Sequence, residues 1–122
     1  MRILLAEDDR NFGRVLKTEL EEDGYDVELV PDGLEAVLKF IDRAHDFVLL
    51  DIRMPKIDGI SALKIIKRLN PDVPAITISG HAGSAEMTES VDVGAMRCLP
   101  KPFEIADLKD GIKTYFAGRM RL

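Results

Sequence analysis

The chain has 122 residues, a formal net charge of −5 at pH 7 and a single cysteine. This length is enough for one domain with a buried core and too short for two ordinary domains, and the negative charge argues against direct binding of nucleic acid. No apolar stretch approaches the roughly 18 residues of a membrane span, and one cysteine excludes an internal disulfide, so we expect a cytoplasmic domain with no membrane contact.

Five short apolar runs alternate with five amphipathic stretches along the chain. An apolar run that is ended by charge is typical of a strand buried on both faces of a parallel sheet. The predicted strands are Arg2–Ala6, Asp26–Val30, Phe47–Asp51, Ala75–Ser79 and Met96–Leu99. Strands that alternate with helices favour right-handed crossovers, so we predict an α/β fold, a three-layer (βα)5 sandwich.

Apolar residues recur at helical spacing between the predicted strands. The segment Ser84–Val93 is the weakest of these helices, because it offers only Ala85, Met87 and Val91 as contacts to a core. We expect this helix to be marginal and able to shift. In the other helices, the predicted inward-facing sets are Phe12, Val15, Leu16 and Leu20; Leu34, Val37, Leu38 and Ile41; Ile60, Leu63, Ile66 and Leu69; and Ile105, Leu108, Ile112 and Phe116.

Acidic residues begin where two of the apolar runs end. Glu7, Asp8 and Asp9 follow the first run, and Asp51 is the last residue of the third. The carboxyl ends of parallel strands form the edge at which open α/β sheets bind their ligands. Carboxylates that converge there repel one another without a cation, and hard oxygen ligands suit Mg²⁺. The sequence therefore predicts a Mg²⁺ site at this edge.

Two further strand ends add a hydroxyl and an ammonium group. The fourth strand ends at Ser79, and the fifth is followed by Lys101, which lies between two prolines that restrict the backbone on both sides. A lysine held near several acids is the expected counter-charge for a phosphate. After Asp51, Pro55 requires an early turn, which would bring the main-chain carbonyl of Arg53 close to a bound metal. An aspartate in this position can be a metal ligand, a nucleophile or a phosphoryl acceptor.

The set Glu7/Asp8, Asp51, Ser79 and Lys101-Pro102, in this order and spacing, resembles the receiver domain of two-component response regulators. The sequences around Ser79 and Lys101 are similar to those of receivers in enhancer-binding activators and hybrid kinases. The resemblance implies a receiver domain over residues 1–117, with 118–122 as a C-terminal tail or the start of a linker. It also implies a flavodoxin-like, five-stranded parallel sheet of strand order 2-1-3-4-5 and a cis bond between Lys101 and Pro102.

The resemblance further implies a phosphorylation-dependent signalling switch in a bacterial phosphorelay. Asp51 would accept a phosphoryl group from a sensor histidine kinase or a phosphotransfer protein, and Ser79 and Lys101 would contact the phosphoryl oxygens. The cofactor would be Mg²⁺, with Glu7, Asp8, Asp51 and the main-chain carbonyl of Arg53 as its ligands. The domain would not be an enzyme beyond catalysing its own phosphorylation and dephosphorylation. An output domain or partner that the sequence does not identify would respond to the phosphorylation state of the domain. The domain could also form a dimer on phosphorylation.

Several assignments stay open at this point. The run of three acids allows the metal-binding pair to shift by one residue. Glu7 and Asp8 are preferred because they directly follow the strand, which leaves Asp9 to cap the next helix. The alternative functions are a degenerate receiver that only binds proteins and a phosphatase with an aspartyl-phosphate intermediate. Against the phosphatase, Asp51 follows the third strand, and the residue two positions later is Arg53 rather than a second acid.

Two histidines and the single cysteine lead to further expectations. His45, in a loop before the third strand, is expected to be exposed and without function. His81 follows Ser79 by two residues, and in the family this position tunes how long the phosphate survives, as does the position held here by Arg53. Cys98 occupies a place where receivers usually have a Tyr or Phe whose ring swings inward. A small thiol there predicts that aromatic switching is absent and that activation moves the fourth helix, Ser84–Val93, and the loop after Ser79.

Overall fold

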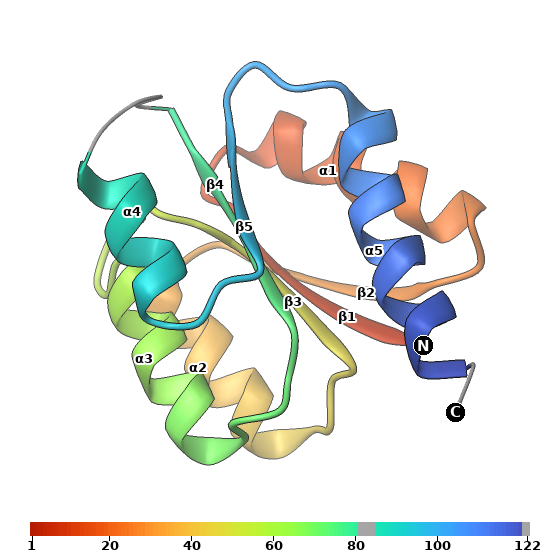
Figure 1. Cartoon of the computed structure of the whole chain (residues 1–122). Helices are drawn as coiled ribbons and strands as arrows, with labels where there is room; N and C mark the ends of the chain where they lie inside the picture. The colour runs from red at the N-terminus through yellow and green to blue at the C-terminus, as the bar shows by residue number, and fades with distance from the viewer. Residues whose placement is uncertain (81–84, 121–122) are drawn as a thin grey trace.

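The computed structural model describes residues 1–80 and 85–120, in which strands and helices alternate around one sheet (Figure 1). The strands are β1 (Arg2–Ala6), β2 (Asp26–Val30), β3 (Phe47–Asp51), β4 (Ala75–Ser79) and β5 (Arg97–Pro100). The helices are α1 (Arg10–Glu22), α2 (Gly33–Asp42), α3 (Gly59–Leu69), α4 (Ala85–Asp92) and α5 (Ile105–Met120). Every ladder is parallel and the strand order is β2-β1-β3-β4-β5, which confirms the predicted (βα)5 sandwich and its topology.

The helices form two layers that cover the sheet from both sides. Helices α1 and α5 cover one face, and α2, α3 and α4 cover the other (Figure 1). Side chains alternate along β1, so Ile3 and Leu5 belong to the first core, while Leu4 and Ala6 belong to the second. This double burial explains why β1 and β3 have continuous apolar runs. Within the described residues, no helix has the length and hydropathy needed to span a bilayer.

The strand predictions are confirmed almost to the residue. Four strands have the predicted bounds, and β5 begins at Arg97 and ends at Pro100, one residue later than expected. Its register with β4 pairs Ser79 with Pro100. This pairing places Lys101 directly beyond the end of the ladder, at the carboxyl edge of the sheet.

Three helices begin at an aspartate on that same edge. The side chains of Asp9, Asp32 and Asp58 accept hydrogen bonds from backbone N–H groups in the first turns of α1, α2 and α3. Each bond satisfies a donor that has no partner within its helix. The prediction that Asp9 caps the first helix is confirmed, with a distance of 3.1 Å to the Phe12 nitrogen.

The inward face predicted for α2 is correct for Val37 and wrong for its other three residues. Leu34, Leu38 and Ile41 are exposed, and the buried residues are Gly33, Ala36, Val37 and Phe40. The reason is the close approach of the helix start to the β3–α3 loop: a Cβ atom on Gly33 would lie 1.9 Å from the Ile57 carbonyl oxygen. Gly33 must therefore face inward, which turns the apolar stripe toward solvent. Single members of two other predicted stripes, Val15 of α1 and Leu69 of α3, are also exposed.

The contacts predicted for α4 are only partly correct. Val91 and Ala85 are exposed, Met87 is half-buried, and the fully buried residue is Ser90, whose hydroxyl is hydrogen-bonded to that of Thr77 on β4. The helix is the short and weakly amphipathic one that the sequence predicts, but a buried polar contact holds its centre to the sheet. The predicted first residue, Ser84, lies outside the described residues.

The expectation that His45 is exposed is also wrong. Its side chain is buried beneath the end of α2, where its ring stacks on that of Phe40 with a centroid distance of 5.9 Å. Its Nε2 atom lies 2.9 Å from Glu28 Oε1 on β2. His45 therefore closes the core at the edge of the sheet opposite the acidic residues, and its role is structural.

Candidate functional site

Three carboxylates converge at the carboxyl edge of the sheet. In the ladder between β1 and β3, Ala6 pairs with Leu50, which brings the next residues of the two strands, Glu7 and Asp51, side by side. One carboxylate oxygen from each of Glu7, Asp8 and Asp51 lies within 4.8 Å of the others. Glu7 and Asp51 are buried and Asp8 is exposed. The structure thus brings together the acidic residues that the sequence singled out as a group, while Asp9 turns away to cap α1.

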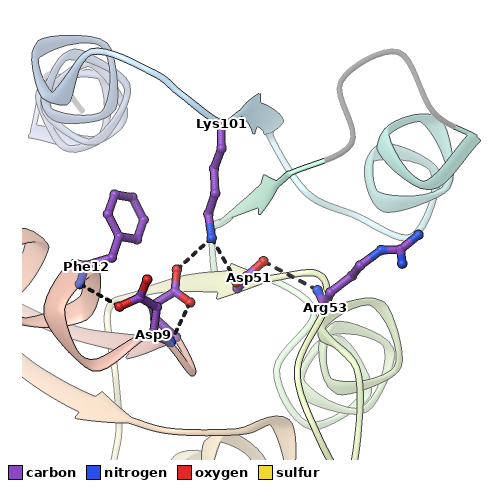
Figure 2. A network of polar contacts seen from close by, with 6 residues as sticks. Asp9, Phe12, Asp51, Arg53 and Lys101 are labelled. Carbon is purple, nitrogen blue, oxygen red and sulfur yellow. Dashed lines mark hydrogen bonds and ion pairs between the residues drawn. The ribbon is translucent and has the colours of Figure 1, made fainter.

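Lys101 follows β5, two strands away from β3 in the sheet, and its side chain reaches into this group. Its Nζ atom lies 3.0 Å from Glu7 Oε1 and 3.1 Å from Asp51 Oδ2, and it stands 4.9 Å from the centre of the Phe12 ring. Figure 2 shows the Lys101 side chain extended toward Asp51. The Lys101–Pro102 bond is cis, as the resemblance implied, and the backbone nitrogen of Lys101 donates to the Ser79 carbonyl oxygen at 2.7 Å.

The charges of this group are strongly coupled. Burial, together with a hydrogen bond to Asp51 and the negative charge of Asp51, raises the pKa of Glu7 to about 7. Burial alone would lower the pKa of Lys101, but its contacts with Glu7 and Asp51 raise it above the ordinary value. The Lys101 ammonium group therefore does not keep the buried Glu7 carboxylate fully ionised at neutral pH. The site has the donor chemistry and the excess negative charge that fit a small divalent cation.

Ser79 ends β4 beside this group. It is buried, and the ladder that pairs Asp51 with Ile78 places it one residue beyond the end of β3. The loop that follows begins at Gly80, and the prediction for His81 lies outside the described residues. Four strand ends, those of β1, β3, β4 and β5, thus contribute the functional groups expected from the sequence to one edge.

The turn after β3 fixes the geometry of Asp51. A Cβ atom on Gly59 would lie only 2.1 Å from the Asp51 carbonyl oxygen, so the start of α3 can approach this strand only without a side chain. The Gly59 nitrogen donates to the Ile52 carbonyl oxygen at 2.7 Å, which closes the turn. Within it, the backbone nitrogen of Arg53 points at Asp51 Oδ1 from 3.4 Å.

One contact at this edge was not anticipated from the sequence. The Arg53 guanidinium donates to Glu86 Oε1 of α4 at 2.7 Å. Both residues line an open groove of about 590 Å³ that also includes Asp8, Met54 and Glu89. An acid in the first turn of a weak helix is a common sequence feature, so only the fold reveals that it faces the turn after Asp51.

Residues 3–113 match the family model described as the response regulator receiver domain. The chain belongs to this family. Its receiver domain is 38% identical over 113 residues to the transcriptional regulatory protein CpxR homolog of Haemophilus influenzae, covering 93% of this chain and 49% of that protein. This chain therefore spans about half the length of such relatives.

Solved receiver domains have the same fold as this chain. The receiver domain of the Francisella response regulator 1452 superimposes with a TM-score of 0.90 at 31% identity, covering 97% of this chain and 98% of that one. The response regulator TrrA of Thermotoga maritima, solved in complex with Mg²⁺ and a beryllium fluoride, gives a TM-score of 0.84 at 32% identity, covering 93% and 96%. The flavodoxin-like class and the family expected from the sequence are both confirmed.

Proposed function

We propose that this receiver domain is a phosphorylation-dependent switch whose phosphoacceptor is Asp51. The observation that supports this most directly is the placement of Lys101 Nζ, within 3.1 Å of both Asp51 and Glu7. An ammonium group so held is ready to neutralise a phosphoryl oxygen on Asp51. Phosphoryl transfer needs little covalent help from a protein, because positioning and charge neutralisation dominate.

In this proposal the Asp51 carboxylate attacks the phosphorus of the donor and forms an acyl phosphate. The bond from phosphorus to the donor's nitrogen or oxygen breaks, and the electron pair leaves with the donor. Asp51 reacts as a carboxylate, so no general base has to remove a proton from it. Lys101 pairs with one phosphoryl oxygen, and the Ser79 hydroxyl bonds another.

The carboxylates of Glu7, Asp8 and Asp51, with the main-chain carbonyl of Arg53, are the proposed ligands of Mg²⁺. Their common edge and their mutual distances within 4.8 Å support this set for the three acids, as does the Mg²⁺ complex of TrrA. When bound, Mg²⁺ would neutralise part of the charge of the acids and of the incoming phosphoryl group.

The proposed donor is a sensor histidine kinase or a phosphotransfer protein, and the proposed reader is an output domain or a separate partner. Relatives about twice as long, such as the transcriptional regulatory protein of Haemophilus influenzae, support an attached output domain. We place residues 1–117 in the receiver domain and treat 118–122 as the beginning of a linker or as a tail. A dimer that forms on phosphorylation, and a location in the cytoplasm, remain part of the proposal.

Incubation with acetyl phosphate and Mg²⁺, followed by intact-mass measurement, tests this function. The wild type should gain the mass of one phosphoryl group, and Asp51→Asn should gain none. Asp58→Asn is the matched control, because Asn also caps a helix and position 58 lies at the same edge; its labelling should equal that of the wild type. Full labelling of Asp51→Asn would refute the assignment, and an unlabelled wild type would favour a protein-binding scaffold.

A further inference from the structure

Helix α4 is held to the rest of the domain mainly by polar contacts. Glu86 pairs with Arg53 of the β3–α3 turn at 2.7 Å, and Glu89 pairs with Lys64 of α3 at 3.8 Å. The centre of the helix is fixed by the buried hydroxyl pair with β4 described above. A helix with so little apolar burial changes position when one of its polar contacts changes.

Arg53 connects this helix to the acidic group. Its backbone nitrogen is 3.4 Å from Asp51 Oδ1, so the side chain begins next to the carboxylate. The conformation of the side chain then determines where the guanidinium lies. Figure 2 shows the side chain directed away from Asp51, toward α4. The open groove has Asp8 in its lining together with Arg53 and Glu86, so it extends from the acidic group to the helix.

We propose that the Arg53 guanidinium exchanges partners, leaving Glu86 for the phosphoryl group when Asp51 is modified. This inference rests on the proposed function, and it makes the Arg53–Glu86 ion pair the link between the phosphorylation site and the position of α4. Glu86 is a positioning residue in this scheme, since it acts only through Arg53.

The relative strengths of the two contacts favour the exchange. The side chain of Arg53 is 61% exposed and that of Glu86 is 31% exposed, so their ion pair is in contact with solvent and changes an equilibrium by at most about fivefold. A phosphoryl group has more charge than a carboxylate, and its oxygens match the planar guanidinium for two parallel hydrogen bonds. Because Arg53 is exposed and borders an open groove, its side chain can turn without displacing the core.

The coupling is reciprocal, which provides a test. Removing the Glu86 charge should release Arg53 and tighten the binding of an anionic phosphoryl mimic. The probe is beryllofluoride in saturating Mg²⁺, titrated by isothermal calorimetry into the wild type, Glu86→Gln, Arg53→Gln and the double variant. Glu89→Gln is the matched control, because it removes the same charge from the same helix but its partner is Lys64.

Glu86→Gln should bind the mimic about two- to fivefold more tightly than the wild type, and Glu89→Gln should change the affinity less. Arg53→Gln should bind it about two- to fivefold more weakly, and adding Glu86→Gln to that variant should restore nothing. A structural effect of Glu86 on α4 would instead appear with or without Arg53.

Two results would overturn the inference. One is an equal gain from Glu86→Gln and Glu89→Gln, since a general loss of negative charge would explain it. The other is the same effect of Glu86→Gln in the presence and absence of the Arg53 guanidinium. A wild type that binds neither Mg²⁺ nor the mimic would refute the proposed function itself, whereas normal binding without coupling would refute only the partner exchange.

Discussion

The raised pKa of Glu7 predicts an unusual pH dependence of stability in the absence of divalent cations. Below pH 4.5 the carboxyl group is protonated in the folded and unfolded chains alike, so it has no effect. Between pH 4.5 and about 7 the unfolded chain gives up a proton that the folded chain keeps, and the free energy of unfolding falls as the pH rises. Well above pH 7 the group is ionised in both states, and the loss is complete and constant.

The size of this loss follows from the two pKa values. A pKa of 4.5 in the unfolded chain and about 7 in the fold corresponds to a loss of up to about 3 kcal/mol. Other acids titrate in the same range, so the effect must be isolated. Glu7→Gln does this, because glutamine has the shape of a protonated glutamate and stays neutral at every pH.

The measurement is urea denaturation in EDTA, followed by circular dichroism, for the wild type and Glu7→Gln from pH 4.5 to pH 8. The variant's advantage in unfolding free energy should grow by up to about 3 kcal/mol across this range, on the order of 10 °C in melting temperature at the upper end. Millimolar Mg²⁺ at pH 8 should stabilise the wild type and largely remove the difference. A difference that stays constant with pH would show that burial and Asp51 do not perturb Glu7.

Three further outcomes test the packing around the site and the response of α4 to a phosphoryl mimic. Thr77→Val leaves the buried hydroxyl of Ser90 without its partner and should cost about 1–3 kcal/mol in urea denaturation, and adding Ser90→Ala should cost little more. Gly59→Ala places a Cβ atom 2.1 Å from the Asp51 carbonyl oxygen, so we expect both a lower melting temperature and weaker Mg²⁺ binding; retention of both would contradict the close approach. With Cys98 in place of an aromatic ring, amide NMR with beryllofluoride should show its largest shifts in α4, and a response confined to the region around Cys98 would refute this.

The sequence predicted the sheet better than the helices, for a physical reason. Strands β1 and β3 are buried on both faces, so each is a continuous apolar run whose end is marked by a polar residue. A helix has many faces, and the rotation of α2 is decided by the contact of Gly33 with the Ile57 carbonyl, which belongs to a loop distant in the chain. The apolar stripe Leu34, Leu38 and Ile41 was therefore a plausible core face that the fold does not use.

The candidate site was predictable to the extent that its residues end strands. Glu7, Asp51, Ser79 and Lys101 are brought together because they stand at strand ends on one edge of the sheet. The alternating pattern predicts the parallel sheet, and the family resemblance implies its strand order. His45 and Glu86 were not predictable in this way, because both depend on side-chain contacts between distant segments. A histidine in a short polar loop resembles any exposed histidine until its stacking on Phe40 is seen.

The three capping aspartates determine how this edge of the sheet treats dissolved anions. Helix N-termini ordinarily attract phosphate through their unpaired N–H groups and positive dipole ends. Here Asp9, Asp32 and Asp58 each accept from one of those groups, on α1, α2 and α3, and add negative charge of their own. The edge therefore offers inorganic phosphate or sulfate little attraction, despite being the place where a phosphoryl group is proposed to reside. Such selectivity would let a signalling domain ignore the anions that surround it and respond only to a group delivered through a covalent bond.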